Sequence, residues 1–427
     1  MQKEIITVIG VGYVGLPLAC LLATKKYKVY GLDTNKTLVD KINKGIPPIN
    51  DSLVVKSLAK IVPEYLRATQ DAKVIGKSDI VIVSVPTPVD KSYQPDFEPI
   101  IKATETIAKN LKKGQLIVIE STINPGVSEE IILPILEKQK FKAGKDFYLA
   151  HVPERINPGD PKRDVSNLPR NVGAVTKKGL KRAIDFYESI IDAPINPMNS
   201  IKAAEATKTI ENAFRDINIA FVNELAKSFD QLGIDVVEVI KGASSKFSFM
   251  PHWPSCGVGG HCIPVDPYYL IQKAEAVGFS HDFLKLARRI NNNMPNYTVE
   301  LLQDALNELK LPIKNTSIGV LGISYKANIG DTRESPSFKI IEQLEKMGAK
   351  IITFDPFVKK HSTEKSLKDI LKKSVAIIVA TDHSDFVNMI DGDILKESKV
   401  KLVIDGKNCL DKNNIEACGI KYKGIGR

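Results

Sequence analysis

The sequence predicts an α/β protein with two doubly wound sheet domains, joined by a long central helix and a helical middle domain. Three observations lead to this prediction. Apolar runs suited to strands alternate with longer helical stretches from residue 4 to about residue 175. A segment without Gly or Pro lies between Met198 and Leu232, and the strand–helix alternation then restarts after Pro312. Such alternation is typical of βαβ units.

The first α/β domain is predicted from six apolar runs separated by helical stretches. Strands buried on both faces of a parallel sheet read as nearly continuous apolar runs, as these do. We therefore expect a parallel sheet covered by helices on both faces. The six runs are Ile5–Ile9, Lys28–Leu32, Asp79–Val85, Gln115–Glu120, Phe147–Val152 and Asn171–Val175.

The segment between Met198 and Leu232 predicts one long helix. Its apolar residues recur every three or four positions, which is the spacing of one helix face. At 1.5 Å per residue such a helix is roughly 50 Å long, so we expect it to link the domains and to form a homodimer surface. The recurring apolar positions are Ile201, Ala204, Ile210, Phe214, Ile217, Phe221 and Leu225.

A second, smaller α/β domain is predicted after the linker at Pro312. These boundaries give three expected domains, at residues 1–198, 199–311 and 312–427. The expected elements of the last one are strands at Ser317–Gly322, Lys350–Phe354, Val375–Ala380 and Lys401–Ile404, with a helix at Pro336–Met347.

The amino-acid composition indicates what class of protein this is and what kind of partner it binds. The 427 residues are 43% hydrophobic and 26% charged, as in soluble globular proteins, and the net charge is +10. Because Lys and Glu are mixed along the chain, we expect no nucleic-acid partner; the positive charge suits a small substrate that carries two phosphates.

Cysteine usage and apolar run lengths indicate the compartment. Five irregularly spaced cysteines are too few for a disulfide framework in so long a chain. The chain passes from Met1 into a strand pattern without a signal peptide, and no apolar run has membrane-spanning length. We expect a cytoplasmic protein with no membrane partner.

A dinucleotide-binding fingerprint lies at the start of the chain. The loop Gly10-Val11-Gly12-Tyr13-Val14-Gly15 follows a strand and opens a helix, and Asp33 ends the next strand. In such Rossmann-like domains the glycines allow a tight turn, approach of a pyrophosphate and close helix packing, while the acid binds ribose hydroxyls. Asp33 would repel a 2′-phosphate, so the expected cofactor is NAD. The alternative is a purely structural turn.

Cys262 is the candidate nucleophile. The three glycines of Gly257–Gly260 let the backbone fold tightly around a ligand, and a helix beginning near Cys262 would favour its thiolate. In that helix Asp266 would lie one turn further on, where it could assist proton transfer. The alternatives are a small buried thiol or a metal site with Cys256 and His261. A second ligand pair at zinc spacing is missing, so we expect no metal.

Three further groups are candidates for the same site. Lys208 and Asn212 lie four residues apart on the predicted long helix, where a cation and an amide could bind an oxyanion. Glu120–Thr122 and Pro153–Arg155 follow predicted strands directly, at the end of the sheet where ligands bind. The alternative for Lys208 is an ordinary surface lysine. The alternative for Glu120–Thr122 and Pro153–Arg155 is helix capping or a surface ion pair.

Taken in order, these runs resemble the UDP-glucose/GDP-mannose dehydrogenase family over almost the whole chain. The matching runs are Gly10–Pro17, Val85–Pro88, Glu120–Thr122, Pro153–Arg155, Glu205–Lys208 with Asn212, Gly259–Cys262 and Asp331–Pro336. The resemblance implies two Rossmann-like domains, NAD as cofactor, and oxidation of a primary alcohol to a carboxylic acid in two NAD-dependent steps through a cysteine thioester.

The resemblance also implies residue roles. Cys262 attacks the aldehyde, Lys208 and Asn212 stabilise the oxyanion, Asp266 and Glu154 assist proton transfer and hydrolysis, and Thr122 orders water. By the same carry-over, the cofactor site includes Gly10, Gly12, Tyr13, Val14, Gly15, Asp33, Pro86, Thr87 and Thr122. The substrate site includes Glu154, Arg155, Lys208, Asn212, Gly259, Tyr325, Lys326 and Arg333.

Within the family, two runs are similar to the branch that acts on UDP-N-acetylhexosamines, Pro153–Gly159 and His261–Tyr269. UDP-N-acetylmannosamine is the first expected substrate, and UDP-N-acetylglucosamine or UDP-glucose are alternatives. Two runs depart from the family pattern, Met250–Cys256 before the cysteine loop and Asp405–Asn408, where relatives often carry Arg. The sugar contacts and the contacts of the last domain are therefore open to rearrangement.

Two other classes of function are compatible with parts of this pattern. A two-electron hydroxy-acid dehydrogenase shares the N-terminal domain and a Lys–Asn pair but needs no thiol, so Cys262 separates it from the first interpretation. A non-catalytic nucleotide-sugar sensor would bind the same ligands without forming NADH.

Overall fold

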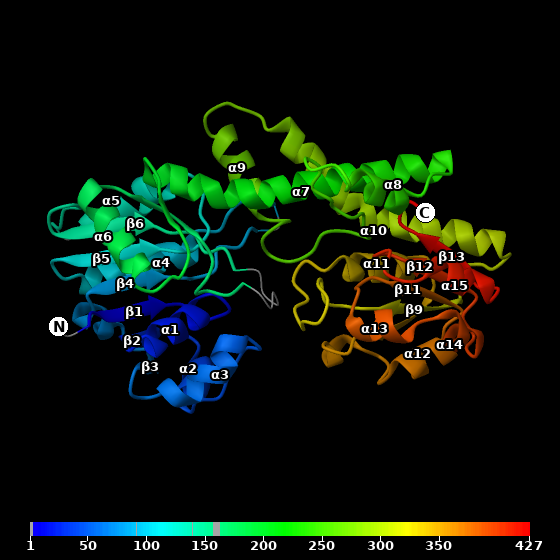
Figure 1. Cartoon of the computed structure of the whole chain (residues 1–427), viewed down its shortest axis with the longest axis horizontal. Helices are drawn as coiled ribbons and strands as arrows, with labels where there is room; N and C mark the ends of the chain where they lie inside the picture. Colours follow the sequence, from blue (N-terminus) through cyan, green and yellow to red (C-terminus); the bar gives the residue numbers. More distant parts are fainter. Residues whose placement is uncertain (1–2, 91, 139, 157–162) are drawn as a thin grey trace. The chain divides into compact units, whose positions relative to one another are not determined.

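The computed structural model describes residues 3–90, 92–138, 140–156 and 163–427. The chain forms two compact units, one of residues 1–211 and 268–279 and one of residues 212–267 and 280–427. Each unit contains one twisted sheet flanked by helices (Figure 1). The predicted α/β class with two Rossmann-like sheets is confirmed, and the three expected domain boundaries stay a prediction.

The first unit contains an eight-stranded sheet in the order β3-β2-β1-β4-β5-β6-β7-β8. Its strands are β1 (Ile5–Ile9), β2 (Lys28–Leu32), β3 (Leu66–Thr69), β4 (Ile80–Val83), β5 (Gln115–Ile119), β6 (Phe147–His151), β7 (Arg170–Ala174) and β8 (Ile195–Pro197). Every residue of β4 and β5 is buried, which explains their unbroken apolar sequence.

One pair in this sheet departs from the expected parallel arrangement. Strands β6 and β7 run antiparallel, whereas the other neighbouring pairs are parallel. The described part of the connection between them contains no helix, so no βαβ crossover returns the chain in the parallel direction. The prediction of a fully parallel sheet was wrong at this pair.

The strand order of the first sheet reverses between β1 and β4. Ligands of open α/β sheets bind beyond the carboxyl ends of the strands at such a switch point. The turn after β1 and the loops after β4 and β5 all start there. The helices of this part of the chain are α1 (Gly15–Thr24), α2 (Lys36–Asn43), α3 (Ser52–Ile61), α4 (Glu98–Asn110), α5 (Leu133–Glu137) and α6 (Lys177–Glu188).

The second unit contains a five-stranded sheet in the order β10-β9-β11-β12-β13, with all neighbouring strands parallel. Its strands are β9 (Ser317–Leu321), β10 (Lys350–Phe354), β11 (Ala376–Val379), β12 (Leu402–Asp405) and β13 (Lys421–Gly424). Its helices include α8 (Val236–Ala243), α10 (Asp282–Glu308), α11 (Pro336–Lys346), α12 (Leu367–Lys373), α13 (Ser384–Met389), α14 (Gly392–Lys396) and α15 (Lys412–Ala417).

The long helix predicted between Met198 and Leu232 is α7 (Ile201–Leu232), with 32 residues. The Ser200 hydroxyl accepts a hydrogen bond from the Ala203 amide, so the helix begins three residues later than expected. Helix α7 and the shorter α9 (Asp266–Glu275) each contain residues of both units.

Candidate active site

The turn between β1 and α1 has the geometry of a dinucleotide-binding loop. Gly10 has a φ of +84°, and a Cβ there would lie 2.7 Å from the Ser84 carbonyl oxygen. A Cβ on Gly15 would lie 1.9 Å from the Gly10 carbonyl oxygen. A Cβ on Gly12, in contrast, would meet no described heavy atom within 4 Å. Protein packing therefore requires two of the glycines, and Gly12 faces open space, as pyrophosphate approach requires.

Asp33 fixes this loop and stays accessible. Its carboxylate accepts hydrogen bonds from the Val11 amide at 3.0 Å and the Asn35 amide at 2.9 Å, and the residue is only half-buried. Val14 precedes α1, no described side chain caps this helix end, and Tyr13 is 55% exposed. A helix N-terminus of this kind attracts phosphate, so the predicted loop and acid fit NAD.

Replacing Gly12 and Gly15 separately should distinguish ligand approach from helix packing. We expect Gly15→Ala to lower the melting temperature and to abolish NAD binding, because its methyl group collides with the loop backbone. Gly12→Ala should fold with an unchanged melting temperature but weaken NAD binding by about tenfold or more. Thermal unfolding and NADH titration measure both effects. Unchanged NADH affinity in Gly12→Ala would contradict the role of this glycine.

The loops after β4 and β5 are joined to each other and to α9. The Thr87 hydroxyl donates to the Thr122 carbonyl oxygen at 2.6 Å, and the Tyr269 hydroxyl donates to the Thr87 carbonyl oxygen. The Ser121 hydroxyl donates to the Val85 carbonyl oxygen at 2.7 Å. Thr87 and Thr122, predicted for the cofactor site with the exposed Pro86, thus lie together at the switch point.

Glu205 ties the same region to the start of α7. Its buried carboxylate accepts hydrogen bonds from the Gly126 amide at 2.5 Å and the Ser128 amide at 2.9 Å. Burial raises the pKa of Glu205, and these hydrogen bonds oppose the shift. Lys208 follows three residues later on the same helix. The acid of the Glu205–Lys208 run therefore holds the chain after Thr122 in place.

Glu154 belongs to a buried cluster of charged groups in the first unit. Its carboxylate lies 3.2 Å from the guanidinium of the fully buried Arg170 and also accepts a hydrogen bond from the Ile156 amide. Glu120 is also buried, and accepts a hydrogen bond from the Tyr187 hydroxyl at 2.6 Å. Neither Arg170 nor Tyr187 was predicted, because nothing in their local sequence marks them as partners of an acid in the loop after β5 or β6.

This cluster makes the stability of the protein depend on pH. Burial raises the pKa of Glu120 to about 7, although Arg170 and Tyr187 oppose the shift. The folded protein then binds this proton more tightly than the unfolded chain, so stability falls as pH rises from about 4.5 to 7. We expect Glu120→Gln to remove this component, which is worth roughly 2 kcal/mol between pH 5 and 8. Urea unfolding of both proteins at the two pH values measures it; parallel pH dependences would contradict it.

Arg155 is placed in an ion pair within the first unit. Its guanidinium binds both carboxylate oxygens of Glu211, at 3.1 and 2.7 Å, and donates to the Pro169 carbonyl oxygen at 3.1 Å. A substrate anion would have to compete with Glu211 for Arg155. The neighbouring residues 157–159, which belong to a run that resembles the N-acetylhexosamine branch, lie outside the described residues.

The glycine-rich loop before Cys262 packs against a loop of the second sheet. A Cβ on Gly259 would lie 2.6 Å from the Tyr325 Cβ, and one on Gly260 would lie 2.8 Å from the Tyr325 ring. The Gly260 amide also donates to the Arg333 carbonyl oxygen at 2.9 Å. The glycines thus allow the cysteine loop to approach two predicted substrate-binding residues closely, within one unit.

Arg333 brings positive charge to the cysteine. Its guanidinium forms a bidentate ion pair with Asp331, with an Nε–Oδ1 distance of 3.0 Å. Burial disfavours the charged guanidinium, but Asp331, Tyr325 and Cys262 together raise the pKa of Arg333. The Cys262 sulfur also lies 2.9 Å from the His261 Nδ1 atom. An imidazole and a guanidinium thus lie near the thiol, and positive charge beside a cysteine favours its thiolate.

The helix after the cysteine begins later than predicted. Helix α9 starts at Asp266, and Cys262 lies in the preceding turn, where its carbonyl oxygen accepts a hydrogen bond from the Asp266 amide at 2.8 Å. Pro264 disfavours helical geometry at the residue before it, whereas Pro267 occupies the first turn, where proline is tolerated. The prediction of a helix starting near Cys262 was wrong by four residues.

Asn212 and Asp266 are in direct contact. The Asn212 side-chain amide donates to the Asp266 carboxylate at 2.5 Å, and Asp266 is buried. Asn212 lies one turn after Lys208 on α7, as the sequence predicted. Two of the predicted catalytic side chains thus lie together in the second unit.

A line of buried amides holds the segment that precedes the cysteine loop. Arg288 and Asn291 of α10 both bind the Asp216 carboxylate, at 2.5 and 2.7 Å. Asn291 also accepts a hydrogen bond from Asn223, which in turn accepts one from the Ser255 amide at 2.9 Å. This network explains how the unusual Met250–Cys256 approach is anchored.

Cys256 lies in the protein interior and has a structural role, not a catalytic one. It is fully buried, its amide donates to the Gly406 carbonyl oxygen at 2.8 Å, and its thiol donates to the Ala380 carbonyl oxygen at 3.5 Å. Burial raises the pKa of Cys256, which keeps the thiol neutral. In the described part of the chain, no group of three or more His, Cys, Asp or Glu residues is arranged to hold a metal ion.

The Asp405–Asn408 run forms a tight turn around a buried acid. Asp405 accepts hydrogen bonds from the Lys407 and Leu410 amides and from the Tyr422 hydroxyl, at 2.8 to 3.0 Å. Asn408 has a φ of +52° and donates from its side chain to the Ile425 carbonyl oxygen at 3.0 Å. This departure from the family pattern is thus well accommodated by the fold.

Three family models match successive parts of this chain. They describe the NAD binding domain, the central domain and the UDP binding domain of one family, and match residues 4–191, 202–293 and 319–412. The chain belongs to the UDP-glucose/GDP-mannose dehydrogenase family. The cysteine loop lies in the central-domain match, and Tyr325 and Arg333 lie in the UDP-binding match.

Individual dehydrogenases of this family are similar over nearly their full length. A UDP-N-acetyl-D-glucosamine 6-dehydrogenase of Pseudomonas aeruginosa is 37% identical, covering 97% of this chain and 99% of the relative. A UDP-N-acetyl-D-mannosamine dehydrogenase of Pyrococcus horikoshii is 35% identical, covering 99% of each chain. A solved structure of UDP-D-ManNAc dehydrogenase from Pyrococcus horikoshii has a TM-score of 0.93 at 35% identity and 99% coverage of both chains.

Membership of this dehydrogenase family gives the coarse function. The protein is an oxidoreductase that uses NAD, and its substrate is a UDP-sugar. Within residues 3–90, 92–138, 140–156 and 163–427, no helix combines the length and apolar character of a membrane span. Bound NAD would use Gly12, the α1 N-terminus and Asp33, and it would supply the hydride acceptor for each oxidation.

Proposed function

We propose that the protein oxidises the C6 alcohol of UDP-N-acetyl-D-mannosamine to UDP-N-acetyl-D-mannosaminuronate in two NAD-dependent steps. The observation that carries this proposal is the packing of the Cys262 loop against Tyr325 and Arg333. A thiol beside residues of the UDP-binding region is what oxidation of an aldehyde to an acid requires. An ordinary two-electron dehydrogenase has no use for it.

In the proposed mechanism, Cys262 forms and releases a covalent intermediate. After the first oxidation, the thiolate attacks the C6 aldehyde, and a new C–S bond gives a thiohemiacetal. Loss of a hydride from C6 in the second oxidation, with loss of the hydroxyl proton, gives a thioester. Water then attacks the thioester, the C–S bond breaks, and the carboxylic acid leaves with Cys262 restored.

The other predicted residues stabilise the negative charge that develops on the substrate, accept protons, or bind the substrate. Lys208 and Asn212 donate to the oxyanion that develops on C6, which stabilises each tetrahedral state. Asp266, held by Asn212, and Glu154, held by Arg170, accept protons during alcohol oxidation and water attack. Thr122 orders the water. Tyr325, Lys326, Arg333 and Gly259 contact the nucleotide-sugar.

The names of similar proteins support UDP-N-acetylmannosamine as the substrate and point to one competing sugar. Relatives from Pyrococcus horikoshii and Methanococcus maripaludis carry the N-acetylmannosamine dehydrogenase name. Two relatives at 37–38% identity carry the UDP-N-acetyl-D-glucosamine 6-dehydrogenase name, which makes UDP-N-acetylglucosamine the second candidate.

Parallel assays with UDP-N-acetylmannosamine, UDP-N-acetylglucosamine, UDP-glucose and GDP-mannose test the assignment. We expect two NADH per UDP-N-acetylmannosamine and the highest kcat/KM for that sugar. Preference for UDP-N-acetylglucosamine would replace the sugar but keep the mechanism. One NADH per sugar would contradict the thioester, and no NADH with any sugar would indicate a nucleotide-sugar sensor.

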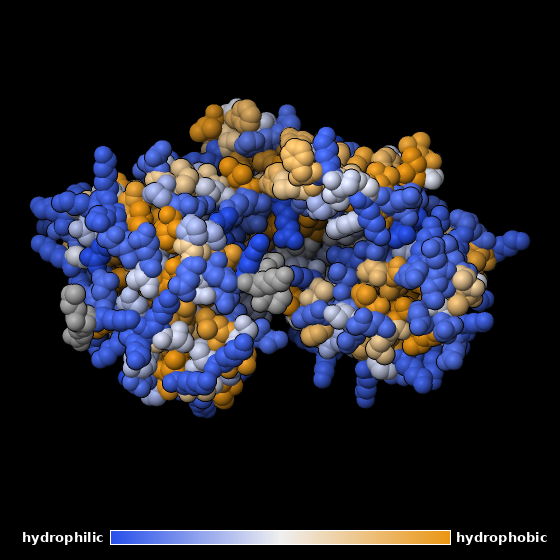
Figure 2. Space-filling view, viewed as in Figure 1, coloured by the Kyte–Doolittle hydropathy of each residue, from blue (hydrophilic) through white to orange (hydrophobic). Residues whose placement is uncertain are grey.

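We also propose that the protein is a homodimer formed through its central helical region. In the second unit, large apolar side chains are exposed on α7 and on the segments near it, including Phe214, Phe221, Phe247, Met250, Trp253 and Phe283, with exposures of 44% to 99%. Figure 2 shows apolar residues gathered over α8 in the same unit. A second copy would cover the same patch symmetrically, as in most homodimers.

Phe221→Asp tests this interface, because a carboxylate at the centre of an apolar dimer surface opposes association. We expect a wild-type mass twice that of one chain by light scattering and a single-chain mass for the variant. Met389→Asp is the control, because Met389 on α13 is 51% exposed, close to the 53% of Phe221. A wild-type monomer would contradict the proposal.

A cytoplasmic location follows from the proposed chemistry. In the described structure none of the five cysteines forms a disulfide, and the mechanism requires Cys262 in its reduced form. A reducing compartment that supplies NAD meets both requirements.

A further inference from the structure

The second unit repeats the glycine–acid turn of the cofactor site. Gly322 follows β9 with a φ of +92°, and its amide donates to the Phe354 carbonyl oxygen at 2.9 Å. The next amide, of Ile323, donates to the Asp355 carboxylate at 2.7 Å. In the first unit, Gly10 donates to the Leu32 carbonyl oxygen at 2.9 Å, and the next amide donates to Asp33 at 3.0 Å.

The two acids differ in what else surrounds them. Asp33 is half-buried, as a ribose ligand requires, whereas the Asp355 side chain is fully buried. Asp355 also accepts hydrogen bonds from the amides of Ser324, Phe357 and Val358, at 2.8 to 3.0 Å. His383 adds a fifth contact, with its Nε2 atom 3.1 Å from the carboxylate. The repeated acid is therefore closed to ligands.

His383 has a defined tautomer in this arrangement. Its Nδ1 atom accepts a hydrogen bond from the Asn328 amide at 2.9 Å, so the ring proton lies on Nε2. That proton faces the Asp355 carboxylate and the Ser324 hydroxyl, which is 3.0 Å away. Because both polar groups use the same ring nitrogen, this is not a nucleophile–base–acid relay. The imidazole instead bridges the acid to the two ends of the segment 324–328.

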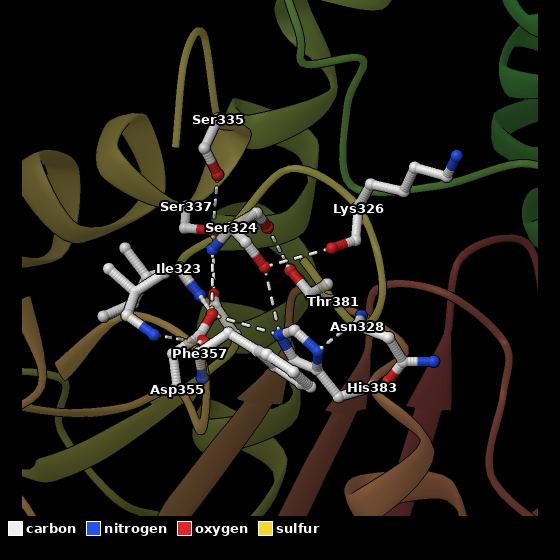
Figure 3. A network of polar contacts seen from close by, with 12 residues as sticks. Ile323, Ser324, Lys326, Asn328, Ser335, Ser337, Asp355, Phe357, Thr381 and His383 are labelled. Atoms are coloured by element: carbon white, nitrogen blue, oxygen red, sulfur yellow. Dashed lines mark hydrogen bonds and ion pairs between the residues drawn. The ribbon is translucent and has the colours of Figure 1, made fainter. Parts of the chain in front are cut away.

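The segment 324–328 is fixed at several further points. The Ser324 hydroxyl donates to the Lys326 carbonyl oxygen at 3.1 Å, and the Thr381 hydroxyl donates to the Ser324 carbonyl oxygen at 2.5 Å. Asn328, with a φ of +61°, exchanges two side-chain hydrogen bonds with Ser384 at the start of α13. In Figure 3 the Lys326 side chain points away from this network.

We propose that His383 is a positioning residue that sets the path of the segment 324–328 and so presents Tyr325 and Lys326 to the diphosphate and uridine of the substrate. This inference rests on the proposed function, because it takes those two residues as substrate-binding. An acid that binds a ribose in the first unit is thus used in the second to anchor a substrate loop. His383, which the sequence did not single out, provides this different role by linking the acid to the substrate loop.

His383→Phe tests the proposal while preserving the ring packing. The His383 ring stacks on Phe357, with centroids 5.1 Å apart, and meets Phe386 edge-on; a phenyl ring can keep both contacts. Asp355 keeps four amide donors, so the sheet should still fold. His361→Phe is the matched control, because His361 is exposed in the same unit.

The measurements separate substrate binding from cofactor binding. We expect His383→Phe to weaken UDP binding, measured by calorimetry, and to raise KM for the UDP-sugar on the order of tenfold or more. The KM for NAD and the melting temperature should stay near the wild-type and His361→Phe values. Equal UDP affinity in His383→Phe and wild type would overturn the inference.

A second variant covers the case in which His383→Phe does not fold. Asn328→Gly keeps the positive φ but removes both side-chain bonds to Ser384, and it should raise KM for the UDP-sugar in the same direction. Unchanged KM there would also overturn the inference. Failure of wild-type protein to bind UDP at all would instead contradict the proposed function, so the two failures are distinguishable.

Discussion

Replacing Cys262 with alanine is expected to stop acid formation and to lower the rate of the second NADH-forming step on the order of 10⁴-fold. Without the thiol, the aldehyde cannot form a thiohemiacetal. The second oxidation then has no hydride donor. The variant should bind NADH normally, because the Gly10–Gly15 turn and Asp33 lie in the other compact unit. It should also bind UDP normally, because the backbone hydrogen bond that joins Gly260 to Arg333 does not involve the Cys262 sulfur. Stopped-flow absorbance at 340 nm and mass analysis of the sugar product measure the effect.

Cys418→Ala is the matched control for this experiment, since Cys418 is an unpaired, partly exposed thiol on the same unit. We expect it to retain two NADH per sugar and the wild-type rate. Two NADH per sugar from Cys262→Ala would refute the thioester mechanism. Trapping of the wild-type enzyme during turnover should also show the sugar attached to Cys262 and not to Cys256.

The second large effect is expected for Asp266→Asn. The amide can still accept the hydrogen bond from Asn212 that the carboxylate accepts at 2.5 Å, so the local geometry should persist. It cannot accept a proton, and we expect kcat to fall on the order of 10²- to 10³-fold with little change in KM. Steady-state kinetics and single-turnover hydrolysis of the thioester measure the loss.

Asp282→Asn controls for the helix, because Asp282 is the first residue of α10 as Asp266 is of α9. Loss of a negative charge at a helix start costs only a few tenths of a kcal/mol, so this control should keep the wild-type kcat. A wild-type kcat in Asp266→Asn would remove this residue from the proton-transfer steps.

The strands show which parts of the fold could be predicted from the sequence and which could not. The buried parallel strands such as Ile80–Val83 were located because an unbroken apolar run marks them. Three strands were missed, Leu66–Thr69, Ile195–Pro197 and Lys421–Gly424. Each has three or four residues and lies at a sheet edge, where one side is open and a long apolar run is not required.

In the active site, local motifs were readable and long-range partners were not. The glycine loop and Asp33 follow a pattern of spacing within one βαβ unit, so the sequence reveals them. Asp355 occupies the corresponding position after β10 and could have been found by aligning the two halves. His383 and Arg170 reach their acids only through the fold, because 28 and 16 residues separate them from Asp355 and Glu154.

The backbone around Cys262 is held on both sides of the sulfur. The Gly260 amide is bound to the Arg333 carbonyl oxygen, and the Cys262 carbonyl oxygen is bound to the Asp266 amide. The Cys262 sulfur therefore cannot move between separate sites, as a reactive group at the end of a long flexible chain does. In the proposed reaction the sulfur that carries the thiohemiacetal is therefore stationary, and NADH from the first oxidation must exchange for NAD while the sugar stays attached to Cys262.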